Sequence, residues 1–284
     1  MPTPLNTILD TDIKIKVVDI GANPIDGTPS YLPLLQAGQA QVVGFEPQPE
    51  ALAELNLKKG PNETYLPLAV GDGKKHTIHF CASSGMTSLF QPNLKVLGLL
   101  HGFPEWSRVV KTEEIITHRL DDVPEAAGFD LLKIDVQGAE LMVMQNALAN
   151  LKDALFIQTE VEFMPFYIDQ PLFSDVDQFL RQYGFVLHRF ERLISRAIKP
   201  LVVNNDIYAG LSQLFWTDAL YIRDFTRLEL LTSDQLLRLA LILNDCYNSI
   251  DLALLLLIEH DKRTQSNYSQ LYQEKGLKVA PAKS

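Results

Sequence analysis

The sequence contains little cysteine, and its two thiols are isolated. Cys81 and Cys246 are far apart in a chain of 284 residues, and neither has a neighbouring Cys or His at zinc-ligand spacing. A structural zinc site needs such spacing, so we predict none. We interpret both side chains as reduced, buried thiols.

A long uninterrupted apolar run is also missing. Residues 236–258 form the most apolar late stretch, but polar side chains break it, among them Asn244, Asp245, Asn248 and Asp251. A membrane span would not tolerate that cluster cheaply. Residues 1–16 contain no apolar core of signal-peptide length. We therefore expect a cytoplasmic protein without a membrane span.

Basic residues are too few for a chain whose main partner is a nucleic acid. The 25 Lys and Arg stand against 35 Asp and Glu, which gives a formal net charge of -10 at pH 7. Proteins that hold a phosphate backbone need the opposite balance, so we expect no nucleic-acid partner. The hydrophobic share of 46% and the charged share of 21% are typical of a globular protein.

Short apolar runs rich in β-branched residues alternate with helical patterns through residues 15–225. The expected parallel strands are 16–20, 41–45, 64–70, 129–136 and 154–161, with an antiparallel pair at 185–190 and 219–223. The expected helices are 49–59, 138–151 and 173–183. This alternation predicts an α/β domain with a doubly wound, Rossmann-like, seven-stranded and mostly parallel sheet with helices on both faces. Two extra strands, 77–80 and 114–118, are expected in the long connection between the third and fourth strands.

The ends of the chain differ from this α/β region. Residues 1–14 look like a lead-in and residues 263–284 like a polar tail. Residues 226–262 place leucines at helical spacing, which predicts a C-terminal helical hairpin with Ser233 as the cap of its first helix. The hairpin is apolar enough to require burial, either on its own domain or on a second subunit. Of these two, we favour a homodimer through these helices.

Acidic residues and glycines gather where the predicted parallel strands end. In an open α/β sheet, ligands bind beyond these carboxyl ends. The residues that close the five strands are, in order, Asp19 with Gly21, Ala22 and Asn23; Glu46 with Pro47; Gly71 with Asp72; Asp135; and Glu160 with Glu162. A buried unpaired carboxylate is costly, so repeated acids at one edge indicate a shared polar pocket. A carboxylate at Glu46 can accept hydrogen bonds from both hydroxyls of a ribose, whereas Asp72 fits a simple turn equally well.

Two nucleoside ligands fit an acidic edge of this kind. A dinucleotide needs the pattern GxGxxG leading into a helix, but the chain continues from Gly21 through Ala22 and Asn23 to Pro24. S-adenosylmethionine has no phosphate and carries a cationic sulfonium, so acidic groups suit it better. The edge therefore favours a methyltransferase over an NAD-type oxidoreductase. A non-catalytic cofactor-binding assembly protein is a third hypothesis, because fold does not fix function.

Three sequence blocks resemble a known family. VVDIGAN at 17–23, GFEPQPEAL at 44–52 and KIDVQGAE at 133–140 are similar to the FkbM family of class I S-adenosylmethionine-dependent methyltransferases, over residues 15–190. The resemblance implies methyl transfer to a hydroxyl oxygen of a sugar, glycan or secondary metabolite, with S-adenosylhomocysteine as product. The chain departs from the family by an inserted Pro24-Ile25-Asp26 and by Gln137, where the family often has Glu.

The resemblance also implies a role for each matching residue. Asp19, Gly21, Ala22 and Asn23 would line the methionine end of the cofactor; Glu46 with Pro47 and Gln48 would hold the ribose; Val70, Gly71 and Asp72 would lie near the adenine; and Asp135 would face the methyl group and the acceptor.

A neutral sugar hydroxyl is a poor nucleophile, so a general base would help the transfer. We predict Asp135 and Glu160 as catalytic residues because both close central strands, with His118 and His188 as alternatives. A divalent metal held by Asp135 with Glu160 or Glu162 is a second hypothesis for this activation, which we do not predict because nothing in the spacing requires it. The small-residue loop 83–88 and the aromatic segment 162–172 are expected to shape the acceptor site.

Overall fold

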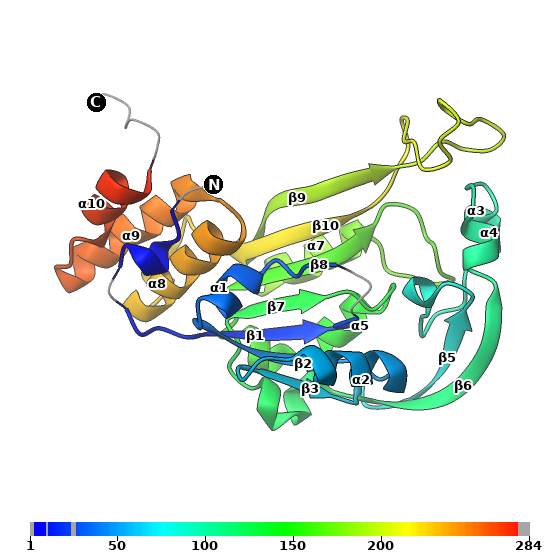
Figure 1. The fold of residues 1–284 in the computed structure, drawn as a ribbon, viewed down its shortest axis with the longest axis horizontal. Helices are drawn as coiled ribbons and strands as arrows, with labels where there is room; N and C mark the ends of the chain where they lie inside the picture. Colours follow the sequence, from blue (N-terminus) through cyan, green and yellow to red (C-terminus); the bar gives the residue numbers. More distant parts are fainter. Residues whose placement is uncertain (1–2, 10, 24–26, 278–284) are drawn as a thin grey trace.

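A seven-stranded sheet forms the centre of the molecule (Figure 1). The structure, a computed structural model, describes residues 3–9, 11–23 and 27–277. The strands, in spatial order, are β3 (Glu63–Leu66), β2 (Ala40–Phe45), β1 (Ile15–Ile20), β7 (Leu131–Ile134), β8 (Phe156–Glu162), β10 (Leu214–Arg223) and β9 (Phe185–Ser195). The pairs from β3 to β8 are parallel, and β10 is antiparallel to both β8 and β9. The predicted fold class and the antiparallel pair are confirmed.

The two faces of this sheet carry separate hydrophobic cores. Because side chains alternate along a strand, Ile15 and Val17 point to one face of β1, whereas Val18 and Ile20 point to the other. The first face packs against α1 (Leu32–Gln36) and the C-terminal helices, and the second against α5 (Glu140–Gln145), α6 (Leu148–Leu151) and α7 (Phe173–Gln182). Helices therefore cover both faces, as predicted, and α2 (Pro49–Lys58) connects β2 to β3.

The expected third strand, 64–70, is divided between two sheets. Its first part is β3, and its last part is β4 (Ala69–Val70), which pairs with β6 (Val109–His118). Pro67 lies between them and has no N–H to donate to a ladder. β5 (Lys75–Cys81) completes this second sheet, in the order β4-β6-β5, so the two extra strands are confirmed. α3 (Leu94–Leu97) and α4 (Phe103–Trp106) lie beyond β5 on the side toward which β1 and β7 point (Figure 1).

The expected helix 138–151 is instead two short helices, α5 and α6. Asn146 follows α5 with a non-helical backbone, φ -109° and ψ 22°, and its side-chain Nδ2 donates to the carbonyl of Met142 at 2.9 Å. This contact satisfies a carbonyl that the interrupted helix leaves without its usual partner. Leucine spacing alone does not reveal such a break, since both pieces bury the same face.

The C-terminal helices pack on the same chain. α8 (Ser233–Leu241), a π-helical turn (Ile242–Cys246) and α9 (Ile250–Thr264) bury Leu236, Leu239 and Leu256 in one core with Ile15 and Val17 of β1. We favoured a homodimer because the apolar helices need to be buried. The sheet of the same chain supplies this burial. No helix of the described residues is long and apolar enough to cross a membrane.

Part of the segment expected to be a polar tail is folded. α10 (Tyr268–Leu271) and a π-helical turn (Tyr272–Gly276) follow α9. The Tyr272 side chain is fully buried, and its hydroxyl donates to Asn244 Oδ1 at 2.5 Å. The predicted start of the polar tail is too early. The tyrosines that anchor this segment are dispersed among polar residues, so the sequence shows no apolar positions at helical spacing.

Candidate functional site

Two clefts lie at the carboxyl ends of the central strands. The edge cleft is lined by the ends of β1, β2 and β7 and by the loop 84–89, and includes Gly21, Asn23, Glu46, Pro47, Gln48, Val70, Asp135 and Gln137. The face cleft extends over the first face of the sheet and includes Asp19, Ala22, Asn23, Lys133, Asp135, Gln158, Glu160, Arg192, Trp216, Asp218 and Tyr247. Asn23 and Asp135 line both clefts, so the two spaces meet at these residues.

A glycine is required where β1 ends at the edge cleft. Gly21 has φ +79°, and a Cβ at this position would lie 1.9 Å from the carbonyl oxygen of Asp135. Its N–H and that of Ala22 donate to the carbonyl of Phe45 at 3.1 and 3.2 Å. The turn therefore fastens β1 to β2 and brings bare backbone to the cleft. The inserted residues 24–26 lie outside the described residues.

Glu46 is the buried carboxylate of the edge cleft. Its side chain is 2% exposed, and its Oε1 accepts the backbone N–H of Gln48 at 2.7 Å. Burial raises the pKa of Glu46, and this hydrogen bond opposes the rise. Pro47 and Gln48 line the same cleft. The residues expected beside the ribose, Glu46, Pro47 and Gln48, therefore lie together in the edge cleft.

Asp19 and Ala22 line the face cleft instead of the edge cleft. The Asp19 carboxylate is 3% exposed and is held by two partners, Lys133 Nζ at 3.1 Å and the hydroxyl of Tyr31 at 2.7 Å. Burial and the neighbouring Asp19 raise the pKa of Tyr31, so this hydroxyl stays protonated and donates. Neither partner follows from the sequence pattern, because both lie on other elements.

Gly71 and Asp72 line neither cleft. The Asp72 Oδ1 accepts from the backbone N–H of Lys74 at 3.0 Å and from His76 Nε2 at 2.7 Å. Burial raises the pKa of Asp72, but these hydrogen bonds outweigh it and lower the pKa to about 2. Of the three residues expected near an adenine, Val70 lines the edge cleft, whereas Asp72 has the contacts of a turn residue.

The two candidate catalytic carboxylates are joined by an amide. Gln137 Nε2 donates to Asp135 Oδ1 at 2.8 Å and to Glu160 Oε2 at 2.9 Å. The hydroxyl of Tyr167 donates to Gln137 Oε1 at 2.8 Å, which fixes the amide orientation. The structure therefore brings Asp135 and Glu160 together, and it adds Gln137 and Tyr167, which sequence reasoning did not assign to the site. Tyr167 belongs to the aromatic segment 162–172.

Burial and mutual repulsion govern the protonation of the acids around Asp135. Burial, then the Asp135 carboxylate, raises the pKa of Glu160, and burial with the Glu140 carboxylate raises that of Glu162. The same causes raise the pKa of Glu140 to about 7, although its Oε1 accepts the N–H groups of Val136 and Gly138. Carboxylates with raised pKa values can hold a proton near neutral pH.

A polar row crosses the floor of the face cleft. Asp19 of β1 is in register with Lys133 of β7, which is in register with Gln158 of β8. These side chains share the face of Ile15 and Val17, so the apolar core of that face gives way to polar groups toward the carboxyl edge. The floor can therefore hydrogen-bond a ligand with several hydroxyls.

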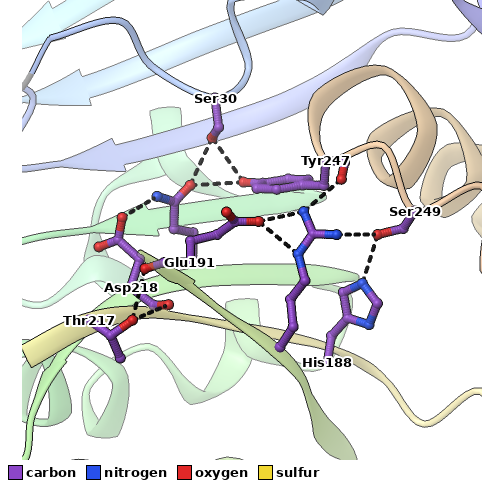
Figure 2. A network of polar contacts seen from close by, with 9 residues as sticks. Ser30, His188, Glu191, Thr217, Asp218, Tyr247 and Ser249 are labelled. Atoms are coloured by element: carbon purple, nitrogen blue, oxygen red, sulfur yellow. Dashed lines mark hydrogen bonds and ion pairs between the residues drawn. The ribbon is translucent and has the colours of Figure 1, made fainter. Parts of the chain in front are cut away.

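The turn between the C-terminal helices forms a wall of the face cleft (Figure 2). The Tyr247 hydroxyl donates to Gln158 Oε1 at 2.9 Å and lies 2.9 Å from Ser30 Oγ. Arg189 Nη2 donates to the Tyr247 carbonyl at 2.6 Å. His188 Nε2 is 2.7 Å from Ser249 Oγ. His188, like His118, lines neither cleft, so the two histidine alternatives are not brought to the site.

Within residues 3–9, 11–23 and 27–277, no three His, Cys, Asp or Glu side chains are grouped so that they could hold a metal ion. The edge cleft combines a glycine turn with the buried Glu46, and the sequence lacks the glycine pattern that binds phosphates. These features are typical of an α/β protein that binds a nucleoside without phosphates.

The Methyltransferase FkbM domain family matches residues 19–187. The chain belongs to the FkbM family of class I S-adenosylmethionine-dependent methyltransferases, which confirms the predicted family and decides against an NAD-type oxidoreductase.

The chain is 31% identical over 172 residues to the 2-O-methyltransferase NoeI of Sinorhizobium fredii (strain NBRC 101917 / NGR234). The match covers 56% of this chain and 65% of the relative, slightly less than two thirds of its length. Similar solved structures include the magnesium protoporphyrin IX methyltransferase ChlM of Synechocystis PCC 6803 with bound SAM, at 12% identity and TM-score 0.39, covering 75% of this chain and 71% of that one. Another is the precorrin-6y C5,15-methyltransferase of Geobacter metallireducens GS-15, at 12% identity and TM-score 0.38, covering 78% and 86%.

Proposed function

We propose that the chain is an O-methyltransferase that moves a methyl group from S-adenosylmethionine to a hydroxyl of a sugar, glycan or secondary metabolite. The observation that carries this proposal is the meeting of the edge cleft and the face cleft at Asn23 and Asp135. A transfer between two substrates needs two binding spaces with a common boundary, because the donor carbon and the acceptor oxygen must touch. The family, and the 2-O-methyltransferase activity that the relative's name states, support the same reaction.

The edge cleft fits the donor. Bare backbone at Gly21 admits a close ligand, the buried Glu46 offers an acceptor for ribose hydroxyls, and the Asp135 carboxylate suits a cationic group. S-adenosylmethionine, when bound, supplies an electrophilic methyl group and leaves as S-adenosylhomocysteine. In this proposal, Asn23 lines the methionine end and Gln48 lies beside Glu46.

The face cleft fits the acceptor. Its polar floor offers both donors and acceptors, and Tyr65, Trp216 and Tyr247 add aromatic surface. Aromatic faces beside polar groups suit a sugar ring, whose C–H faces are apolar and whose hydroxyls need hydrogen bonds. Holding the acceptor in this position can lower the barrier by roughly 7–11 kcal/mol.

Asp135 and Glu160 are placed to take the proton of the acceptor hydroxyl. Both line the face cleft, and Gln137 holds one oxygen of each. Burial and the Asp135 carboxylate raise the pKa of Glu160, so when ionised it is a stronger base than an exposed glutamate. In this role, Gln137 is a positioning residue, because it acts through the two acids.

Methyl incorporation from labelled S-adenosylmethionine into a panel of sugars, glycans and secondary metabolites tests the proposal. We expect at least one acceptor to be methylated on oxygen, and Asp135→Asn to lower the rate by about 10²–10⁴-fold. Asp12→Asn, an exposed acid outside both clefts, serves as the control and should keep the rate. Binding of S-adenosylhomocysteine without methylation of any acceptor would favour the non-catalytic alternative.

We also propose a cytoplasmic location. Both cysteines are free thiols, and Cys81 is buried. Free thiols are usual in a reducing compartment. To test this, the protein is taken from its source cells and unfolded in the presence of an alkylating reagent. Alkylation of both thiols would support the proposal, whereas a disulfide between Cys81 and Cys246 would contradict it.

A further inference from the structure

Two arginines outside the matched family domain line the face cleft. Arg192 is on β9 and Arg196 follows its end, whereas the family match stops at residue 187. β9 runs parallel to β8, because both are antiparallel to β10. The two arginines therefore lie toward the same edge of the sheet as Asp135 and Glu160.

Other cations of the face cleft are already paired. Lys133 is bound to Asp19 at 3.1 Å, and Arg189 Nε donates to Glu191 Oε1 at 2.7 Å. Among the residues that the structure describes, neither Arg192 nor Arg196 joins an ion pair. Asp218 and Asp206 interact with Arg192 and Arg196 only at longer range, so neither guanidinium has a carboxylate of the described residues in direct contact.

A bulge in β9 places Arg192. The register passes from Glu191 opposite Asp218 to Ile194 opposite Trp216, so two residues of β9 stand opposite Thr217 alone. Arg192 has φ 54°, in the left-handed region that a bulky residue rarely adopts. Bulges redirect side chains near active sites, and this one puts a cation on the wall of the face cleft.

Arg196 is held by stacking and keeps an unsatisfied donor. Its guanidinium carbon lies 4.8 Å from the ring centroid of Trp216, and its Nη1 donates to the carbonyl of Ser195 at 3.0 Å. Its Nε is buried and has no hydrogen-bond partner. A buried donor without a partner is uncommon in a protein and points to a group that binds there.

We infer that the acceptor carries an anionic oxygen group, a carboxylate or a phosphate, which Arg192 and Arg196 bind while its hydroxyl lies at Asp135 and Glu160. The inference rests on the proposed function and specifies its substrate class. In the sheet, β10 lies between β8 and β9, so the backbones of these two strands are roughly 10 Å apart. The arginine side chains reach across part of this distance, so one acceptor molecule can span both subsites. A guanidinium fork suits planar or tetrahedral oxyanions.

Calorimetric titration of the protein with glucuronate, glucose 6-phosphate and glucose tests this, in the presence of saturating S-adenosylhomocysteine. At least one anionic sugar should bind about 10- to 100-fold more tightly than glucose. Arg192→Gln and Arg196→Gln should each remove most of that preference without changing the affinity for S-adenosylhomocysteine. Arg227→Gln, outside the cleft, is the matched control and should keep it. The two anionic probes distinguish a carboxylate from a phosphate.

Equal binding of all three sugars, or no binding of either anionic sugar, overturns the inference. The inference is also overturned if Arg192→Gln and Arg196→Gln both still bind the anionic sugar more tightly than glucose. Failure of the wild-type protein to bind S-adenosylhomocysteine would instead overturn the proposed function, so the two failures can be told apart.

Discussion

At the scale of the residue, one amide organises the candidate catalytic centre. Gln137 donates to Asp135 and Glu160 and accepts from Tyr167, with a left-handed backbone of φ 57°. A glutamate, which the resemblance leads one to expect here, would place a third carboxylate between two others. The sequence shows Gln137 as a departure from the family but cannot show its role, because its partners Glu160 and Tyr167 come from β8 and from the loop after it.

Gln137→Glu should lower methyl transfer by roughly 10-fold or more at pH 8, because the two carboxylates lose their donor and gain a repelling charge. Protonation of the new carboxyl restores an O–H donor, so the ratio of variant to wild-type rate should rise as the pH falls toward 6. Rates measured across this pH range check the prediction. Gln182→Glu, at the exposed end of α7, is the control. A ratio that is constant with pH would contradict the donor role.

Other site residues could be predicted to different degrees. Gly21 and Glu46 follow from local patterns, a glycine turn and an acid at a strand end, and both line the edge cleft. Asp19 obeys the same pattern, yet Lys133 and Tyr31 hold it on the face cleft. Position relative to the strand end decides this difference: Asp19 lies within β1 on its first face, whereas Gly21 and Glu46 follow the ends of β1 and β2 and line the edge cleft. The sequence could place Asp19 at the edge but not choose its cleft.

At the scale of the element, periodicity predicted the strands better than the helix ends. β1 and β2 differ by one residue from their expected bounds, because their apolar runs are continuous and end at a polar turn. The break at Asn146 and the burial of Tyr272 depend on tertiary contacts and were missed. The cap of α8 was also assigned one residue late: Gln235 N–H donates to Thr232 Oγ1, whereas Ser233 lies inside the helix.

Thr232→Ala should lower the free energy of unfolding by about 1 kcal/mol, because the Gln235 N–H loses the Thr232 hydroxyl that caps α8, while the Thr232 N–H still donates to Gln235 Oε1. Ser233→Ala, at the adjacent position, should change it much less. Urea denaturation of both variants and the wild type makes the comparison. A larger loss for Ser233→Ala than for Thr232→Ala would contradict the assigned cap.

At the scale of the whole molecule, the C-terminal helices belong to the sheet. They complete one hydrophobic core with β1 and β2, and their turn at Tyr247 forms a wall of the face cleft. The sequence predicted a hairpin that needs burial, but it could not say what covers it, because an apolar stripe does not identify its partner. In the proposed function, acceptor binding would therefore depend on a part of the chain beyond the family match.

A chain that ends at Asp224 should fail to fold cooperatively, since it would expose Ile15, Val17 and their neighbours on the first face of the sheet. Circular dichroism during heating, compared with a chain that ends at residue 277, checks this. The longer chain should unfold like the full protein. Cooperative unfolding of the Asp224 chain at the full-length temperature would show that the helices are a separate unit.

The most direct test of the central claim is calorimetric titration of the full chain with S-adenosylhomocysteine, beside NAD. We predict binding of S-adenosylhomocysteine with one site per chain and no heat with NAD. Glu46→Ala should weaken the binding by about 10-fold or more, because the ribose loses a charged acceptor in a buried position. Glu50→Ala, on the exposed side of α2, should leave it unchanged. Absence of heat with S-adenosylhomocysteine would contradict the assignment of the edge cleft, and unchanged affinity in Glu46→Ala would remove the role of its carboxylate.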